Sequence, residues 1–105
     1  MTNNSMGTFP KEINIENNAL LVSALFKELT MDEVRCLHLL SWGMQRHEIA
    51  EYLDVKPSYV KSRIESMYIK FGVNNTDSLR AIYISRVQFD MYQMLKSITS
   101  GVWVL

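Results

Sequence analysis

The chain of 105 residues is poor in several features that mark common protein classes. It has one cysteine, which excludes an intramolecular disulfide and a cysteine-rich zinc site. No apolar segment approaches the roughly 20 residues that cross a bilayer, and the polar start MTNNSMGTFPKE has no signal-peptide pattern. We expect a single small domain in a reducing cytoplasm, without a membrane partner.

Net charge is also lacking, because 11 basic residues balance 11 acidic ones. This balance argues mildly against a nucleic-acid ligand, since DNA-binding domains often have a basic excess. The basic residues are nevertheless concentrated locally. Between positions 56 and 70 the balance is 4 − 1 = +3, with Glu65 opposed by Lys56, Lys61, Arg63 and Lys70.

Signals of catalysis and metal binding are missing as well. Glycine is scarce, at 4 residues, and there is neither a glycine-rich phosphate loop nor a Ser-His-Asp arrangement. His38 and His47 lack clustered Cys or Asp partners, which argues against a metal site. We therefore expect no enzyme, no metal and no cofactor.

The stretch EIAEYLDVKPSYVKSRI, residues 48–64, has a proline between two runs with helical periodicity. Downstream of Pro57, apolar residues recur at spacings of 4, 3 and 4, at Val60, Ile64, Met67 and Phe71. Proline disrupts the interior of a helix but is favoured at its first position. The stretch therefore predicts two helices, over about 45–53 and 57–71, joined as a helix-turn-helix.

Local capping signals place the remaining helices. Thr30 and Glu33 form a capping box at the start of one helix, and Gly43 ends that helix. The run NNALLVSALFKE predicts a short helix over 17–28, and boundary signals predict a last helix over roughly 76–97. Because no strand signal is present, the sequence predicts an all-α fold.

Three segments follow from these patterns. Residues 1–16, which are rich in Asn, Ser, Gly and Thr, predict a flexible arm. Residues 17–75 form the predicted helix-turn-helix domain with its preceding helix. Residues 76–105 form a predicted C-terminal dimerisation helix and tail.

The run from Leu29 to Val73 resembles the LuxR/GerE-type helix-turn-helix, a four-helix domain, over about half of the chain without a gap. The positions that match the family pattern are Leu29, Thr30, Glu33, Leu37, Leu40, Gly43, Glu48, Ile49, Ala50, Leu53, Val60, Lys61, Met67, Lys70, Phe71, Gly72 and Val73. The resemblance implies a bacterial transcription regulator, located at the nucleoid in the cytoplasm. It also implies binding to promoter duplex DNA through residues 57–71.

The sequence departs from that family pattern at several positions. Gln45 and Lys56 replace the Ser or Thr that caps each helix of the pair in the family, and Asp54 replaces the Gly of the turn. Tyr59, Arg63 and Thr76 stand where the family has a Thr, a His and an Arg. Cys36 stands where the family places an aliphatic residue, so we expect it in the core.

A helical wheel over 57–71 separates an apolar arc from an outer face that would enter the major groove. The outer face consists of Ser58, Ser62, Glu65, Ser66 and Ile69. Serines bond several base edges, and Glu65 could accept from a cytosine amino group. Side chains suited to phosphates lie on the flanks and at the helix starts, and they are Arg46, His47, Lys56, Tyr59, Lys61, Arg63 and Lys70.

About 28 residues precede the motif, which is too few for a receiver or ligand-sensing domain. We therefore expect control through the abundance of the protein or through a partner, with RNA polymerase as a further candidate partner. The alternative is a protein-interaction module of the same fold with weak or no DNA binding. The neutral charge, Thr76 and Glu65 motivate that alternative.

Apolar residues spread around more than one face of the last predicted helix. A surface helix normally shows one apolar stripe, and the last helix of the resembling family commonly makes a dimer contact. We expect a homodimer, or a heterodimer with a related regulator, that reads an inverted repeat with half-sites roughly 34 Å apart. The expected contact residues are Ile84, Val87 and Met91, with Arg80 and Arg86 nearer the edge. Alternatively, the N-terminal helix and the tail over 102–104 cover the extra face.

Overall fold

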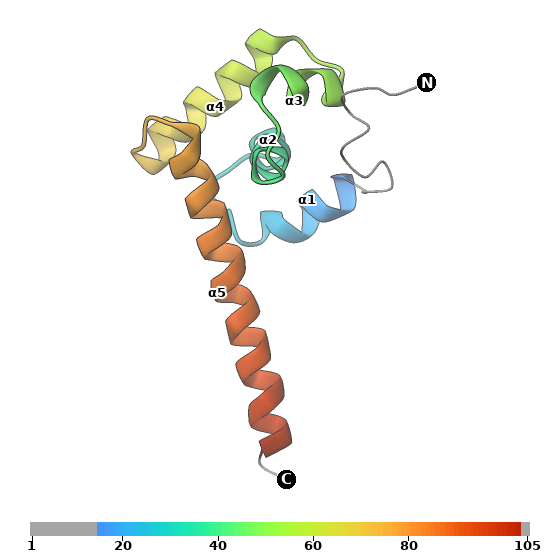
Figure 1. Cartoon of the computed structure of the whole chain (residues 1–105), viewed down its shortest axis with the longest axis vertical. Coiled ribbons are helices and arrows are strands. Elements are labelled where there is room, and N and C mark those ends of the chain that lie inside the picture. The colour runs from blue at the N-terminus through green and yellow to red at the C-terminus, as the bar shows by residue number, and fades with distance from the viewer. Residues whose placement is uncertain (1–14, 104–105) are drawn as a thin grey trace.

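The computed structural model describes residues 15–103, with side chains from 18 to 100. These residues form five α-helices and no strand (Figure 1), which confirms the all-α prediction. The helices are α1 (Ile15–Ser23), α2 (Met31–Ser41), α3 (Arg46–Leu53), α4 (Pro57–Phe71) and α5 (Thr76–Trp103). No helix in this described part of the chain is long and apolar enough to cross a membrane.

The core is built around α2, which lies in the middle of the domain (Figure 1) and packs against each of the other four helices. Its side chains that are at most 1% exposed include Val34, Cys36, Leu37, Leu39 and Leu40. Burial raises the pKa of the Cys36 thiol to about 11, so this cysteine is a core residue, as predicted.

Local signals set the start of α2 and the ends of α2 and α4. The Thr30 hydroxyl accepts a hydrogen bond from the Glu33 N–H at 3.2 Å, and the Glu33 carboxylate accepts one from the Thr30 N–H at 2.8 Å. This capping box confirms the sequence prediction. Gly43 and Gly72 follow α2 and α4 with φ values of 93° and 67°, a conformation that glycine adopts without a steric cost.

The turn between α3 and α4 retains the conformation that a glycine would favour. Asp54 occupies the left-handed region, at φ 58° and ψ 50°, where Asp is tolerated better than most residues at a cost of about 1 kcal/mol. Pro57 then takes the first position of α4, where its missing N–H is not needed. The predicted ranges for both helices therefore agree closely with the structure.

The predicted helix over 17–28 is wrong at both ends. Its helix, α1, includes Ile15 and Glu16, which the sequence had assigned to the arm, and it ends at Ser23. The chain then turns so that Phe26 enters the core, where it is 0% exposed. The remainder of the predicted arm, residues 1–14, lies outside the described residues.

The helix α5 differs in its two halves. Its first part, residues 76–87, packs on the domain through the buried Leu79 and Tyr83 and the half-buried Val87. Every side chain from Gln88 to Ser100 is exposed, and Figure 1 shows this part projecting beyond the domain. We call residues 88–100 the distal segment. Because every side chain of the distal segment is exposed, the N-terminal helix does not cover it. The side chains of the tail over 102–104 lie outside the described residues.

Candidate nucleic-acid interface

The two faces of α4 are those that the sequence predicted. Val60, Ile64 and Met67 are completely buried. The opposite face exposes a row of residues at spacings of 4, 3 and 4, which are Ser58, Ser62, Glu65 and Ile69. The last of these, Ile69, is 83% exposed. Spacings of three and four place these side chains in one row. The row offers hydroxyls, one carboxylate and one apolar group to a ligand.

Ser66, which the wheel placed on the outer face, and Lys70, which it placed on a flank, both bind α2 instead of remaining open. The Ser66 hydroxyl and the Lys70 ammonium donate to the Glu33 carboxylate at 2.5 and 2.7 Å. Glu33 is only 1% exposed. Burial alone would raise its pKa, but the bonds from Lys70, Ser66 and the Thr30 N–H outweigh burial and hold the pKa below the usual 4.5. The ionised Glu33 thus ties α4 to α2.

Tyr59 and Arg63 are also held by neighbours. The Tyr59 hydroxyl donates to the carboxylate of Asp32 on α2, and the Arg63 guanidinium stacks over the Tyr59 ring, 5.4 Å from its centroid. Among the described residues, the buried Arg63 Nε has no hydrogen-bond partner. No local sequence signal pointed to Asp32, because its contact with Tyr59 spans 27 positions. Tyr59 therefore orients the start of α4 and supports Arg63.

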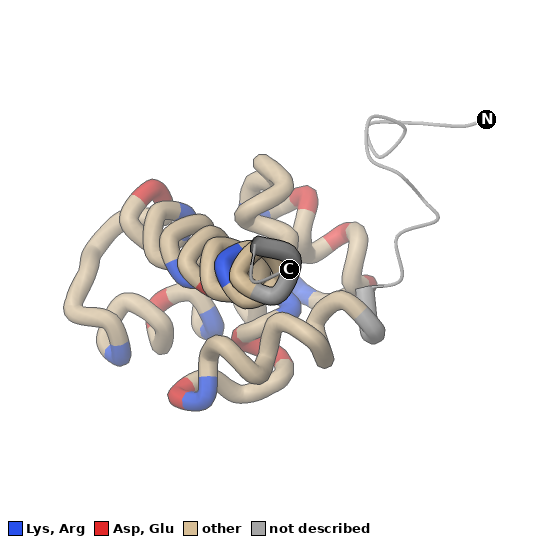
Figure 2. The backbone as a smooth tube through the Cα atoms, turned by 90° about the horizontal axis from the view of Figure 1, so that it is seen from below, with Lys and Arg blue, Asp and Glu red and all other residues tan. Residues whose placement is uncertain are grey.

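The other side chains predicted to bind phosphates are exposed. Lys56 and Lys61 lie at the start of α4, and Arg46 and His47 lie in the first turn of α3. A polar depression of about 410 Å³ joins the starts of α3 and α5, and it is lined by Leu40, Gln45, Arg46, His47, Thr76 and Arg80. Across the domain, basic and acidic positions are interspersed (Figure 2).

The residues predicted at the dimer contact are in different environments. Ile84 and Met91 are 46% and 53% exposed, whereas Val87 packs partly against the core of its own chain. Arg80 and Arg86, predicted at the edge of the contact, instead bind their own domain. Arg80 donates to the carbonyl oxygens of Leu40 and Met44.

Arg86 joins α5 to the segment between α1 and α2. It donates to the Leu25 carbonyl oxygen and to both carboxylate oxygens of Glu28, each at 2.8 Å. Its guanidinium also lies over the rings of Phe26 and Phe71, at 4.9 and 5.4 Å from their centroids. A planar, charged group can make both kinds of contact at once, so Arg86 fixes the last turn of α5 that touches the domain.

Comparison with known proteins gives one match. The model of the family described as bacterial regulatory proteins, luxR family, matches residues 27–82, just over half of the chain. Neither a search of curated proteins nor a search of solved structures found a significant match. The matched region contains the capping box, the helix-turn-helix and the packed start of α5. The chain therefore belongs to the LuxR family of bacterial regulatory proteins, a family of DNA-binding transcription regulators.

Proposed function

We propose that this chain regulates transcription in the bacterial cytoplasm, at the nucleoid, by binding promoter duplex DNA through α4. The observation that supports this proposal is the open row of Ser58, Ser62 and Glu65, opposite a fully buried face. A helix of this kind fits the major groove, where serine hydroxyls and a carboxylate can bond base edges. Ile69 adds an apolar group that suits a thymine methyl.

Phosphates would be bound by the exposed cations around this row. Lys61 flanks it and Lys56 precedes it. Arg46 and His47 add positive or polar groups at the start of α3, together with backbone N–H groups of its first turn. Such contacts orient the protein on DNA without reading the sequence.

In this proposal the protein acts as a dimer, and its activity is controlled by its abundance or by a partner. The exposed apolar residues of α5 support a protein contact. The family match covers α2, α3, α4 and the start of α5, while α1 precedes the matched region and α5 extends beyond it.

Binding to labelled duplexes, selected from a random pool and followed by fluorescence anisotropy, tests the proposal. Lys61→Ala should weaken binding to all sequences by about tenfold, and Glu65→Gln should change the selected sequence. Lys96→Ala, which removes the same charge from the distal segment, is the control and should leave affinity unchanged. Lys70→Ala should have a smaller effect than Lys61→Ala because Glu33 already pairs that charge.

A second function is a protein-interaction module of the same fold. The interspersed charges and the paired Lys70 favour it. If Lys61→Ala combined with Arg63→Ala left DNA affinity unchanged at low salt, α4 would not be the DNA-binding element. If the unmodified protein did not bind duplex DNA at low salt, this second function would replace the first.

A further inference from the structure

One flank of α4 faces α2 and carries four residues at spacings of 4, 3 and 4, which are Tyr59, Arg63, Ser66 and Lys70. The first, third and fourth of these donate to the carboxylates of Asp32 and Glu33 on α2. Within the described part of the chain, the Arg63 guanidinium donates only to the Ser62 hydroxyl, at 3.2 Å. Arg63 therefore lies in a row of bonded side chains without a carboxylate of its own.

The two carboxylates that α2 places on this flank are bound by other partners. One Asp32 oxygen accepts a hydrogen bond from Tyr59, and the other accepts one from Arg35 at 2.7 Å. Glu33 pairs with Lys70 at the same distance, 2.7 Å. Arg63 thus keeps an unpaired positive charge on a flank whose acidic groups are already bonded.

Arg63 is nevertheless held in place. Its guanidinium lies over the Tyr59 ring, 5.4 Å from the centroid, and its Nε atom is buried. The Tyr59 ring is itself fixed, because its hydroxyl is bonded to Asp32. By contrast, the Nη1 atom of Arg63 is not buried and makes no hydrogen bond within the described part of the chain. One edge of the guanidinium is therefore supported and the other is open.

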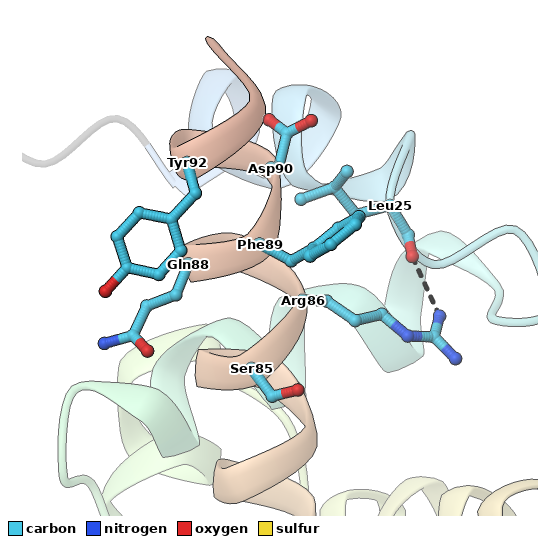
Figure 3. A pocket seen from close by; sticks show the side chains of 7 residues that line it. All are labelled: Leu25, Ser85, Arg86, Gln88, Phe89, Asp90 and Tyr92. Carbon is cyan, nitrogen blue, oxygen red and sulfur yellow. Dashed lines mark hydrogen bonds between the residues drawn. The ribbon is translucent and has the colours of Figure 1, made fainter. Parts of the chain in front are cut away.

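Arg86 provides a comparison within the same chain. It also lies over an aromatic ring, that of Phe26, at 4.9 Å. Its N–H groups, however, donate to both Glu28 oxygens and to the Leu25 carbonyl oxygen, a bond that Figure 3 shows. Arg86 is thus satisfied by its own chain. Arg63 has similar support from a ring but no carboxylate, so an anion from outside the chain can bind it.

We propose that Tyr59 and Asp32 are positioning residues that hold Arg63 in place to bind one phosphate of the DNA backbone. This inference rests on the proposed DNA binding through α4. Arg63 lies on the flank of α4 and not in its open row, so it faces a phosphate and not the base edges. A guanidinium binds a phosphate through two parallel N–H groups, and a side chain that is fixed beforehand loses less entropy on binding.

This arrangement changes the role of Tyr59. The sequence predicted that Tyr59 binds a phosphate itself, whereas in the proposal it acts through Arg63. Tyr59 and Arg63 stand where the family pattern has a Thr and a His, and neither of those side chains can form a stack of a guanidinium on a tyrosine ring. The support of Arg63 is therefore not part of that family pattern.

Fluorescence anisotropy of a labelled duplex across a salt series tests the phosphate contact. Arg63→Ala should weaken binding to all sequences by about tenfold and make the salt slope shallower by about 0.9, the value for one phosphate. Arg63→Lys keeps the charge but lacks the planar fork, so affinity should fall by about threefold at an unchanged slope. Tyr59→Leu should have the same effect as Arg63→Lys, because it leaves Arg63 charged but unsupported.

A double-mutant cycle shows whether Tyr59 acts through Arg63. Once Arg63→Ala is present, Tyr59→Leu should cause no further loss of affinity. Additive losses would show that Tyr59 binds DNA by itself and would overturn the proposal. Tyr59→Phe, which removes the bond to Asp32, should weaken binding by about twofold, whereas Tyr52→Phe, the same change on α3, is the control and should leave affinity unchanged. Circular dichroism should show that each variant is folded.

Nuclear magnetic resonance of the free protein tests the support of Arg63 without DNA. Nitrogen relaxation of the arginine Nε groups should show Arg63 as rigid as Arg86 and more rigid than the exposed Arg46. Tyr59→Leu should make Arg63 as mobile as Arg46 and leave Arg86 unchanged. A mobile Arg63 in the unmodified protein would overturn the proposal.

The two experiments separate this inference from the proposed function. If the unmodified protein binds no duplex at low salt, the proposed function is wrong, and the phosphate contact of Arg63 is wrong with it. If the protein binds duplex DNA and Arg63→Ala leaves both the affinity and the salt slope unchanged, only the present inference is wrong.

Discussion

The two halves of α5 are continuous in the backbone and similar in apolar content, yet their side chains are in opposite environments. Leu79 in the first half is 0% exposed, whereas Leu95 in the distal segment is 53% exposed. The difference arises from what lies beside the helix and not from the helix itself. The position of an apolar residue along α5 therefore determines whether its side chain is buried in the core or exposed on the surface.

The largest expected effect is a contrast between the same substitution in the two halves. Leu79→Ala should lower the free energy of unfolding by about 3 kcal/mol because it leaves a cavity in the core. Leu95→Ala, at a dilution where the protein is monomeric, should change it by less than about 0.5 kcal/mol. Urea denaturation followed by circular dichroism measures both. Equal losses would show that the distal segment is packed within one chain.

A smaller loss is expected where the two halves meet. Arg86→Ala should lower the free energy of unfolding by about 1–2 kcal/mol, since it removes the bond to the Leu25 carbonyl and the stacking on two rings. Arg86→Lys should restore only part of this, because lysine lacks the planar fork that binds both Glu28 oxygens. If Arg86→Lys restored the full free energy of unfolding, the planar guanidinium would not be needed and charge attraction alone would explain the contact.

The Arg86–Glu28 pair should also add an acid-dependent part to stability. Hydrogen bonding to Arg86 is the main cause that lowers the pKa of Glu28 from 4.5 to about 2. Because the folded state resists protonation, this stabilisation is complete above pH 4.5 and is lost as the pH falls toward 2. Comparing the pH dependence of unfolding in the parent and in Glu28→Gln measures it, and identical profiles would contradict it.

The smallest effect concerns the buried contact of His38 with the first half of α5. His38 Nδ1 lies 2.8 Å from the Tyr83 hydroxyl, and burial lowers the pKa of His38 below 6.5. The unfolded chain therefore binds a proton that the folded chain resists, and stability should decrease as the pH falls below 6.5. His38→Gln should remove this dependence, whereas replacing the exposed His47 by Gln should retain it. A profile unchanged by His38→Gln would contradict the assignment.

The sequence predicted well what depends on local signals. The capping box, Pro57 and the glycines after α2 and α4 each act within a few residues, so the bounds of α2 to α4 agree with the structure. The helix over 17–28 was wrong because burial of Phe26, a tertiary effect, ends α1 early. Helical propensity alone contains no information about that burial.

The candidate site could be predicted only in part, for a related reason. A wheel gives the angle of a side chain on α4, but it does not show that a carboxylate from α2 reaches Ser66 and Lys70. The residue spacing on the last helix likewise placed Arg86 near the edge of the dimer contact, whereas the long side chain reaches back to Glu28. The contacts of long polar side chains depend on partners that are distant in sequence.

The pairing of Lys70 with Glu33 has a thermodynamic consequence for any DNA complex. Each cation that neutralises a phosphate releases condensed counterions, which sets how steeply affinity falls with salt. Lys70 is already neutralised within the protein, so of the four basic residues at positions 56–70 three remain to displace counterions. Their contribution to the slope of log affinity against log salt is then about −2.7, which is shallower than the roughly −3.6 that four free cations would give.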